Sequence, residues 1–194
     1  MLIKNRDEIK KILDNDGVIA FVTDTVWGLG CLPDSEKAVK KIYEIKKREA
    51  QKPLILMSSS IEYLEPYVKE ISPKAQDLIK KHFPGALTLV LEKSGRTPDY
   101  ITSGFNTVGI RVPDNDVFKE ICGLAKDKVL ATTSANLSHE PSAKTYEQAI
   151  LNMQGKADLI IEDYGYRAKG LESTVALVQN DNVKILRQGE IILK

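Results

Sequence analysis

The chain has 194 residues, of which 42% are hydrophobic and 28% are charged, the proportions of an ordinary globular protein that can bury a core. Its 28 basic and 27 acidic residues leave a net charge of +1, so binding of nucleic acid would need a local basic patch. The sequence lacks a signal-peptide core and any run of the roughly 20 apolar residues that a membrane span needs. Two cysteines and two histidines can form neither a disulfide framework nor a zinc cluster. We therefore expect a cytoplasmic protein without structural zinc.

Hydrophobic periodicity predicts alternating helices and strands at the start of the chain. Asn5 precedes a helix that ends near residues 14–17, and a short buried strand follows over residues 18–22. We interpret residues 23–33 as a ligand-contacting loop, because in open α/β sheets ligands bind beyond the carboxyl ends of strands. The polar residues that open this segment fit a simple turn or helix cap equally well. A second helix begins at Asp34 or Ser35.

The same patterns continue to the end of the chain. Capping boxes at Ser59 with Glu62 and at Thr145 with Gln148 predict two helix starts, and Ser72 before a proline predicts a third. The polar segment 93–106 is expected to be a long functional loop. Strands are expected at residues 54–57, 86–92, 108–112, 129–133, 159–161, 173–178 and 183–187. No repeat or linker interrupts this order, so we predict one three-layer α/β domain over residues 1–194 with a mixed sheet.

Hydroxyl and basic side chains recur at the predicted strand ends and in the adjoining loops. Arginine binds phosphate or carboxylate through two parallel hydrogen bonds, and hydroxyl groups can complete such an anion site. The candidates are Thr25, Arg48, Lys52, Thr107, Arg111, Thr132, Ser134, Asn136, Ser142, Ser173 and Arg187. The histidines do not suggest a Ser-His-Asp triad, and neither a P-loop nor a G-x-G-x-x-G motif occurs. These residues predict an anion site without identifying the anion.

Seven short motifs occur in an order that resembles the YrdC-type threonylcarbamoyl-AMP synthase family. They are T-D-T-V-W-G-L-G at 23–30, K-K-R at 46–48 followed by K-P at 52–53, P-G-A-L-T at 84–88, G-I-R-V-P at 109–113, T-S-A-N-L-S at 133–138, E-S-T-V at 172–175 and L-R-Q-G at 186–189. The resemblance implies a YrdC-like fold whose twisted sheet has a concave ligand-binding face. Val22 and Trp27 stand where this family usually has proline and tyrosine, so we expect a modest change in pocket shape. Because the chain ends soon after L-R-Q-G, we expect the extra C-terminal domain of longer relatives to be missing.

The resemblance also implies an activity. The family condenses L-threonine, bicarbonate or CO₂, and ATP to threonylcarbamoyl-AMP and pyrophosphate, the first step toward N6-threonylcarbamoyladenosine at position 37 of tRNA. Residues implied to surround threonine are Thr25, Met57, Arg111, Thr132 and Ser173, and residues implied to hold ATP are Arg48, Lys52, Thr107, Ser134, Asn136, Ser142 and Arg187. Lys46 and Arg48 form the K-x-R element and are the predicted catalytic residues. Mg²⁺ would accompany ATP without a dedicated protein site, and other proteins would transfer the product to tRNA.

Two other interpretations stay open. The first is a non-catalytic protein of the same fold that binds double-stranded RNA or tRNA, against which the near-zero net charge argues. Even a synthase could bind RNA weakly. The second is a paralogue that acts on another carbamoyl compound, like the related domain of hydrogenase-maturation carbamoyltransferases. Those proteins usually carry zinc-finger and acylphosphatase segments, which this sequence does not contain.

Overall fold

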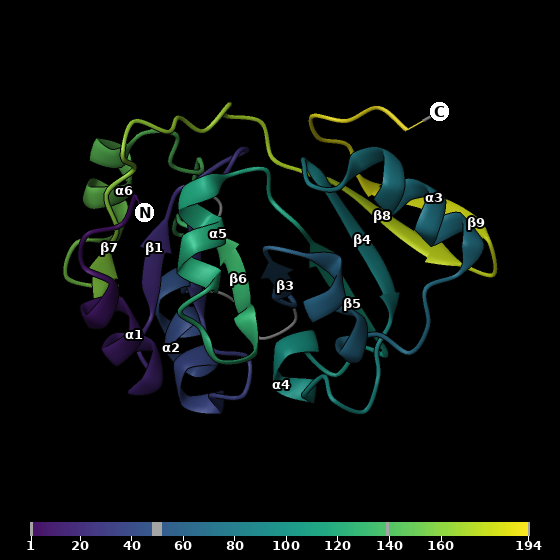
Figure 1. The fold of residues 1–194 in the computed structure, drawn as a ribbon, viewed down its shortest axis with the longest axis horizontal. Coiled ribbons are helices and arrows are strands. Elements are labelled where there is room, and N and C mark those ends of the chain that lie inside the picture. The colour runs from purple at the N-terminus through teal and green to yellow at the C-terminus, as the bar shows by residue number, and fades with distance from the viewer. Residues whose placement is uncertain (1, 48–51, 139, 194) are drawn as a thin grey trace.

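The computed structural model describes residues 2–47, 52–138 and 140–193, and nine strands of these residues form one mixed sheet (Figure 1). The strands lie in the order β7-β1-β2-β6-β3-β5-β4-β8-β9. Their bounds are β1 (Ile19–Phe21), β2 (Gly28–Cys31), β3 (Ile55–Ser58), β4 (Leu87–Glu92), β5 (Thr107–Arg111), β6 (Val129–Ser134), β7 (Leu159–Ile160), β8 (Thr174–Gln179) and β9 (Asn182–Arg187). The pairs β1/β7, β3/β5 and β4/β8 are parallel and the other neighbours are antiparallel. The predicted mixed sheet is confirmed.

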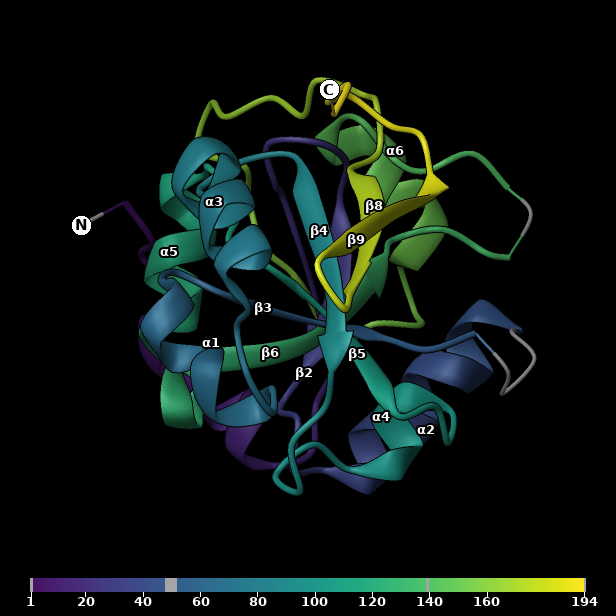
Figure 2. The ribbon, with the colours of Figure 1, turned by 90° about the vertical axis from the view of Figure 1, so that its right-hand side faces the viewer.

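Helices cover both sides of this sheet. Figure 2 shows α1, α3 and α5 on one side and α2, α4 and α6 on the other, which is the predicted three-layer arrangement. The helices are α1 (Arg6–Asp14), α2 (Glu36–Lys46), α3 (Pro73–His82), α4 (Asp99–Thr102), α5 (Asp116–Cys122) and α6 (Tyr146–Met153), with 3₁₀ turns η1 (Ile61–Tyr63), η2 (Glu65–Tyr67) and η3 (Lys126–Lys128). In the part of the chain that is described, no helix is long and apolar enough to cross a membrane.

Three predicted caps are present at the starts of the longer helices. The hydroxyl of Ser35 accepts a hydrogen bond from the third backbone N–H after it at 3.1 Å, and Ser72 and Thr145 do the same at 3.4 and 3.3 Å. These bonds satisfy N–H groups that a helix leaves without an internal partner. Asn5 precedes α1 as predicted, but its side-chain amide donates to the Glu8 carboxylate, so it does not cap the backbone.

The capping box predicted at Ser59 and Glu62 is wrong. The segment forms only the short turn η1, preceded by Ser60, whose side chain makes no capping hydrogen bond. Pro66 in the adjacent turn η2 explains why no longer helix follows, because proline has no N–H to donate and its ring clashes with the preceding turn. The long loop predicted over residues 93–106 is also interrupted, by the single-turn helix α4.

Residues 28–31 are a strand, which corrects the prediction of one continuous loop over residues 23–33. β2 pairs with β1 on one side and with β6 on the other. A Cβ atom at Gly28 would lie 2.7 Å from the ring of Phe21, and one at Gly30 would lie 3.0 Å from the same ring. The glycines therefore let an aromatic ring lie flat against the strand, and this close approach accounts for residues that are otherwise poor strand formers.

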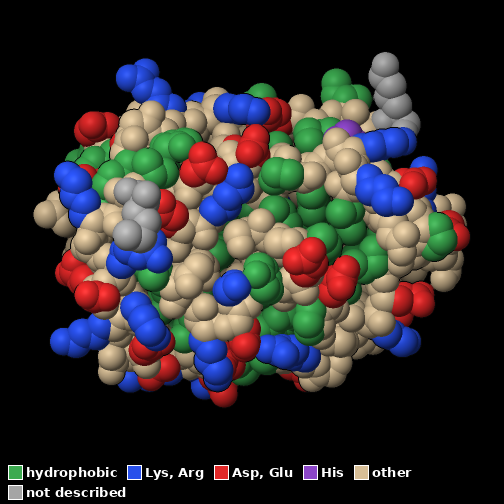
Figure 3. Space-filling model, in the orientation of Figure 1, with side chains coloured by type: hydrophobic (Ala, Val, Ile, Leu, Met, Phe, Trp, Pro, Cys, Tyr) green, Lys and Arg blue, Asp and Glu red, His purple; other side chains and the backbone are tan. Residues whose placement is uncertain are grey.

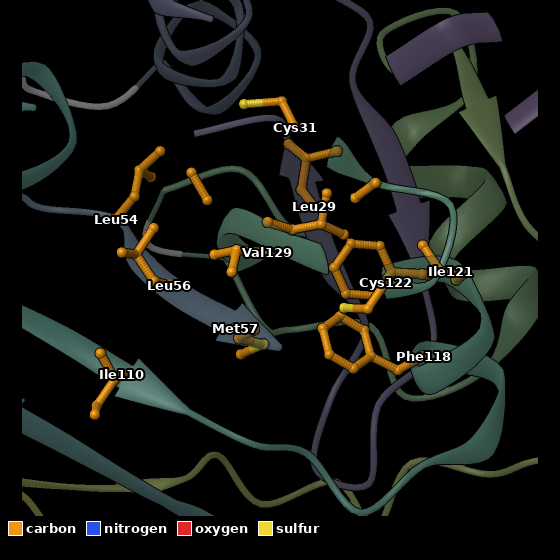
Figure 4. Packing of buried hydrophobic residues seen from close by; sticks show 14 of the residues in the cluster. Leu29, Cys31, Leu54, Leu56, Met57, Ile110, Phe118, Ile121, Cys122 and Val129 are labelled. Carbon is orange, nitrogen blue, oxygen red and sulfur yellow. The ribbon is translucent and has the colours of Figure 1, made fainter. Parts of the chain in front are cut away.

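The core includes buried residues of helices on both sides of the sheet (Figure 2), and one part of it lies between the sheet and the helix layer that contains α5. Figure 4 shows Phe118 and Cys122 of α5 pointing toward Leu29 of β2. The ring of Phe118 lies 5.2 Å from that of Phe21, centroid to centroid, and both rings are fully buried. Burial raises the pKa of the Cys122 thiol well above its ordinary value, so this cysteine behaves as a small apolar side chain.

Candidate functional site

A cavity of about 560 Å³ lies over one face of the sheet, within the size range of small-molecule sites. Alternate residues of the central strands line it, because successive side chains of a strand point to opposite faces. These are Ile55 and Met57, Thr88 and Val90, Thr107, Gly109 and Arg111, Thr132 and Ser134, and Ser173 and Val175. Their neighbours Leu56, Leu89 and Ile110 are buried in the core. The cavity therefore lies across the sheet face, where the resemblance implied a ligand-binding face, and is not confined to the space beyond the strand ends. It is also lined by Thr23, Thr25, Val26, Trp27 and Gly28.

Arg111 is the most firmly held charged side chain of this cavity. Its side chain is 3% exposed and forms an ion pair with Asp24, whose side chain is 6% exposed, with 2.6 Å between Nη2 and Oδ1. Nη1 donates to Thr25 Oγ1 at 2.8 Å and Nε donates to the carbonyl of Gly85 at 2.9 Å. Burial lowers the pKa of the guanidinium, and the charge and hydrogen bond of Asp24 oppose this shift. Three of its five N–H groups are thus fixed within the protein, and each terminal nitrogen keeps one more donor for the cavity.

The hydroxyl of Thr25 is oriented by its neighbours. Thr23 Oγ1 donates to the carbonyl of Val26 at 2.6 Å, so Thr25 is the donor in the 3.1 Å contact between the two threonine hydroxyls. Thr25 also accepts from Arg111, which leaves one lone pair on its oxygen. That lone pair can accept a hydrogen bond from an ammonium, amide or hydroxyl group in the cavity.

Ser173, Glu172 and Arg187 form a second polar group at the cavity wall. Ser173 Oγ lies 2.8 Å from Thr88 Oγ1, and its carbonyl accepts from Arg187 Nε and Nη2 at 3.2 and 2.9 Å. The Glu172 carboxylate pairs with Arg187 Nη1 and accepts from Ser142 Oγ at 2.9 Å. Arg187, at the end of β9, is therefore bonded to the two residues that precede β8, through the Ser173 carbonyl and the Glu172 carboxylate.

Residues 189–191, which follow β9 and which we call the C-terminal clip, hold the polar group of Glu172, Ser173 and Arg187 in place. The Thr174 hydroxyl donates to the carbonyl of Ile191 and accepts from the N–H groups of Gly189 and Ile191 at 3.0 and 3.1 Å. A Cβ atom at Gly189 would lie only 2.2 Å from the Glu172 carbonyl oxygen, so only glycine fits. The C-terminal clip thus packs directly against the backbone of Glu172 and Ser173, which line the cavity.

Lys46 is buried, with 3% of its surface exposed, and does not line the cavity. Its ammonium donates to the carbonyls of Ser134 and Asn136 at 2.6 and 2.8 Å and to Asn136 Oδ1 at 3.0 Å. The same Oδ1 accepts from Ser134 Oγ at 2.6 Å. These contacts connect α2 to the end of β6, so Lys46 acts on the cavity wall through the backbone that carries Ser134.

The structure brings together most of the residues predicted for the site. All five predicted for threonine line the cavity, and so do Lys52, Thr107, Ser134 and Arg187 of the set predicted for ATP. Asn136 and Ser142 lie one contact behind the wall, bonded to Ser134 and Glu172. Arg48 lies outside the described residues. The functional roles of all these residues stay predictions.

Sequence reasoning assigned no role in the site to Asp24, which holds Arg111, or to Glu172, which lines the cavity. Asp24 lies in the T-D-T motif and Glu172 in the E-S-T-V motif, but their partners lie 87 and 15 positions away, and no local pattern reveals such pairs. Trp27, from which we expected a change in pocket shape, lines the cavity and is fully buried, with its ring 5.7 Å from that of Tyr146. An acidic residue between two threonines at the end of a predicted strand is the one sequence signal that could have pointed to Asp24.

A larger depression of about 870 Å³ between α1 and α2 does not have these features. Its lysines face acidic partners on the surface, as in the pairs of Lys37 with Asp16 at 3.7 Å and Lys41 with Asp158 at 2.6 Å. The charged groups of this depression are therefore exposed and paired with opposite charges. The sheet-face cavity differs because it contains a buried arginine whose donors are held in a fixed orientation.

The order of the cavity-lining motifs along the chain agrees with a family comparison. A model of the Sua5/YciO/YrdC family, which is described as telomere recombination, matches residues 11–189. The chain belongs to the Sua5/YciO/YrdC family. The expected family resemblance and YrdC-like fold are thus confirmed.

Relatives of this Sua5/YciO/YrdC chain include proteins named threonylcarbamoyl-AMP synthase. One from Pyrococcus abyssi is 40% identical over 177 residues, which are 91% of this chain and 52% of the relative. One from Vibrio cholerae is 33% identical over 190 residues, which are 97% of this chain and 99% of the relative. A crystal structure of P. abyssi Sua5 complexed with L-threonine superposes with a TM-score of 0.88 at 36% identity, covering 95% of this chain and 55% of that one. The chain thus spans about half of the archaeal relative and nearly all of the bacterial one.

Proposed function

We propose that this protein is an L-threonylcarbamoyladenylate synthase, which condenses L-threonine, bicarbonate or CO₂, and ATP to threonylcarbamoyl-AMP and pyrophosphate. The observation that carries the proposal is Arg111, a buried and oriented guanidinium that faces a cavity of amino-acid and nucleotide size. The relatives named threonylcarbamoyl-AMP synthase and the threonine complex of a family member support it. The product would serve the threonylcarbamoyl modification of tRNA through other proteins.

The carboxylate of threonine pairs in this proposal with the two remaining donors of Arg111. A guanidinium and a carboxylate match in geometry, and the pair is strong where water is excluded. Asp24 neutralises part of the arginine charge and fixes its plane, so the ligand meets a rigid donor pair. Thr25 accepts from the amine of the substrate, and Met57, Thr132 and Ser173 enclose its side chain.

The reaction needs positioning more than it needs a strong base. The amine of threonine forms a bond to the carbon of CO₂ and loses a proton, and this gives a carbamate anion. A carbamate oxygen then attacks the α-phosphate of ATP, the bond to the bridging oxygen breaks, and pyrophosphate leaves with the electron pair. Both reactants are anions, so cationic groups that hold them together and offset the developing charge supply most of the catalysis. Lys52 and Arg187, which both line the cavity, would take this part, together with Arg48 of the K-x-R element.

The predicted catalytic role of Lys46 takes a more specific form in this proposal. The Lys46 ammonium holds the carbonyls of Ser134 and Asn136, and so places the Ser134 hydroxyl on the cavity wall. Lys46 would therefore act as a positioning residue for the nucleotide, while Arg48 would contact the phosphates.

Mg²⁺ would enter with the nucleotide. Among the described residues, no group of three or more His, Cys, Asp or Glu side chains comes together as a metal site. Mg²⁺ is commonly held largely by water and substrate phosphates, so the ion would bind with ATP without a dedicated protein site. When bound, the ion would neutralise charge on the phosphates.

The RNA-binding alternative receives no support from the surface drawn in Figure 3. Lys and Arg side chains are interspersed there with Asp and Glu, and no continuous basic stripe is visible on that face. Non-specific RNA binding depends on clustered positive charge.

Incorporation of labelled bicarbonate tests the proposal. Purified protein would be incubated with ¹⁴C-bicarbonate, ATP, Mg²⁺ and L-threonine, and the nucleotide product would be separated and its mass determined. We expect label in a product with the mass of threonylcarbamoyl-AMP, and none when threonine is replaced by D-threonine. Label in a nucleotide product that forms without any threonine would instead indicate a paralogue acting on another carbamoyl compound.

A further inference from the structure

Glu172 connects two side chains that the proposed function assigns to ATP. Its Oε1 accepts from the Ser142 hydroxyl at 2.9 Å, and its Oε2 pairs with Nη1 of Arg187. Ser142 lies in the segment before α6 and Arg187 ends β9, so a single carboxylate joins two separate parts of the site. Carboxylate and phosphate oxygens are equivalent acceptors for a guanidinium N–H and a hydroxyl.

We infer that the Glu172 carboxylate competes with the phosphate groups of the nucleotide for Arg187 and Ser142, and thereby sets the affinity of the site for ATP. This inference rests on the proposed function. The Ser142 hydroxyl has a single proton, so it cannot donate to Glu172 and to a phosphate at the same time. Nη1 of Arg187 keeps a second N–H, but Glu172 already neutralises part of the charge that a phosphate would meet there. A triphosphate therefore engages the Ser142 hydroxyl and the full charge of Arg187 only when the Glu172 carboxylate moves aside.

The two ion pairs of the cavity differ in how easily they can be exchanged. The side chains of Arg187 and Glu172 are 46% and 36% exposed, whereas those of Arg111 and Asp24 are 3% and 6% exposed. Exposed ion pairs contribute little because water screens them, while a buried pair is costly to break. A more highly charged anion can thus displace the Glu172 carboxylate from Arg187. The buried pair of Asp24 and Arg111 stays intact, because breaking it would cost too much free energy.

Arg187 keeps its place when Glu172 moves. Its Nε and Nη2 donate to the carbonyl of Ser173 at 3.2 and 2.9 Å, and Nη2 also lies 3.3 Å from Ser173 Oγ. These bonds involve neither Nη1 nor Glu172. The guanidinium therefore changes the partner of one nitrogen without a change of rotamer, which makes the exchange from carboxylate to phosphate inexpensive.

Binding of ATP and of adenosine to Glu172→Gln and Glu172→Ala tests the inference without turnover. Isothermal titration calorimetry without threonine would compare both variants with the wild type and with Glu62→Gln. Glu62 is exposed in η1, does not line the cavity, and controls for the change in net charge. We expect ATP to bind Glu172→Gln about three to ten times more tightly than the wild type, in line with removal of a weak competing ion pair. Adenosine has no phosphate, so its affinity should not change.

The Arg187→Gln background separates competition from simple charge repulsion. We expect the gain caused by Glu172→Gln to shrink there, since the contested guanidinium is gone. In turnover, the KM for ATP should fall in Glu172→Gln and the KM for threonine should stay constant.

Each contrary result has a distinct meaning. Unchanged or weaker ATP binding by Glu172→Gln, with normal binding by the wild type, overturns the competition and leaves the proposed function standing. A gain that persists undiminished in the Arg187→Gln background overturns it as well. A wild-type protein that binds no ATP overturns both the inference and the proposed function.

Discussion

Asp24→Asn should destabilise the protein and misalign its central arginine, because it removes the negative charge that faces a fully buried guanidinium. The pair spans 2.6 Å between side chains that are 6% and 3% exposed. Removal of one partner from a buried ion pair costs about 3–5 kcal/mol of unfolding free energy, since it leaves the other charge uncompensated. Asparagine keeps the volume and one acceptor oxygen, so we expect the lower end, about 3 kcal/mol. For 194 residues this corresponds to a fall in Tm of about 6–12 °C.

Thermal unfolding followed by circular dichroism measures this effect. Asp77→Asn, on an exposed position of α3, is the matched control and should change the unfolding free energy by less than about 0.5 kcal/mol. The KM for threonine should rise in Asp24→Asn at a temperature where both variants are folded, because the arginine plane is no longer fixed. A Tm for Asp24→Asn within 1 °C of the wild type would refute the assignment of Asp24 as the partner that stabilises Arg111.

Three further predictions concern the clip, the thiols and the N-terminal segment. Gly189→Ala should raise the KM for ATP and lower Tm, since the new Cβ atom meets the Glu172 carbonyl at 2.2 Å; steady-state kinetics that match the wild type would contradict this. Cys31 and Cys122, whose thiol pKa values are raised by burial, should react with Ellman's reagent at pH 8 only as the protein unfolds, so rapid native labelling of both would be contrary evidence. The pKa of Glu120 is lowered, chiefly by a backbone N–H donor, so its contribution to stability is present above about pH 4.3 and is lost as pH falls through the lower native value. Urea unfolding of Glu120→Gln should therefore differ most from the wild type near neutral pH, and an equal difference at pH 3 would refute the linkage.

The alternating pattern and caps predicted most of the fold. The strands of the second half and the cap residues Ser35 and Ser72 follow from rules that act within a few residues, and the structure has a two-residue turn at Asn180 and Asp181 between β8 and β9. Both turn residues have positive φ, 50° and 57°, as a type I′ hairpin turn requires. These features could be predicted because they depend on residues that are close to one another in the sequence.

The predictions failed where contacts between residues far apart in the sequence determine the structure. β2 contains two glycines, and only the ring of Phe21 on the neighbouring strand explains why they belong in a strand. The pair of Asp24 with Arg111 and the contacts of Lys46 with the end of β6 join segments far apart in sequence. The motifs and the resemblance predicted a group of residues and a concave sheet face, but the contacts that join these residues became visible only in three dimensions.

Release of pyrophosphate from ATP tests the central claim most directly. The assay would compare wild type with Arg111→Lys, and would omit L-threonine or bicarbonate in turn. Lysine keeps the charge but cannot make the two parallel hydrogen bonds of a guanidinium. We predict release that requires both threonine and bicarbonate, and for Arg111→Lys at least a tenfold rise in the KM for threonine, about 1.4 kcal/mol, with little change in the KM for ATP. Pyrophosphate release that does not depend on threonine, or an unchanged KM for threonine in Arg111→Lys, would contradict the account.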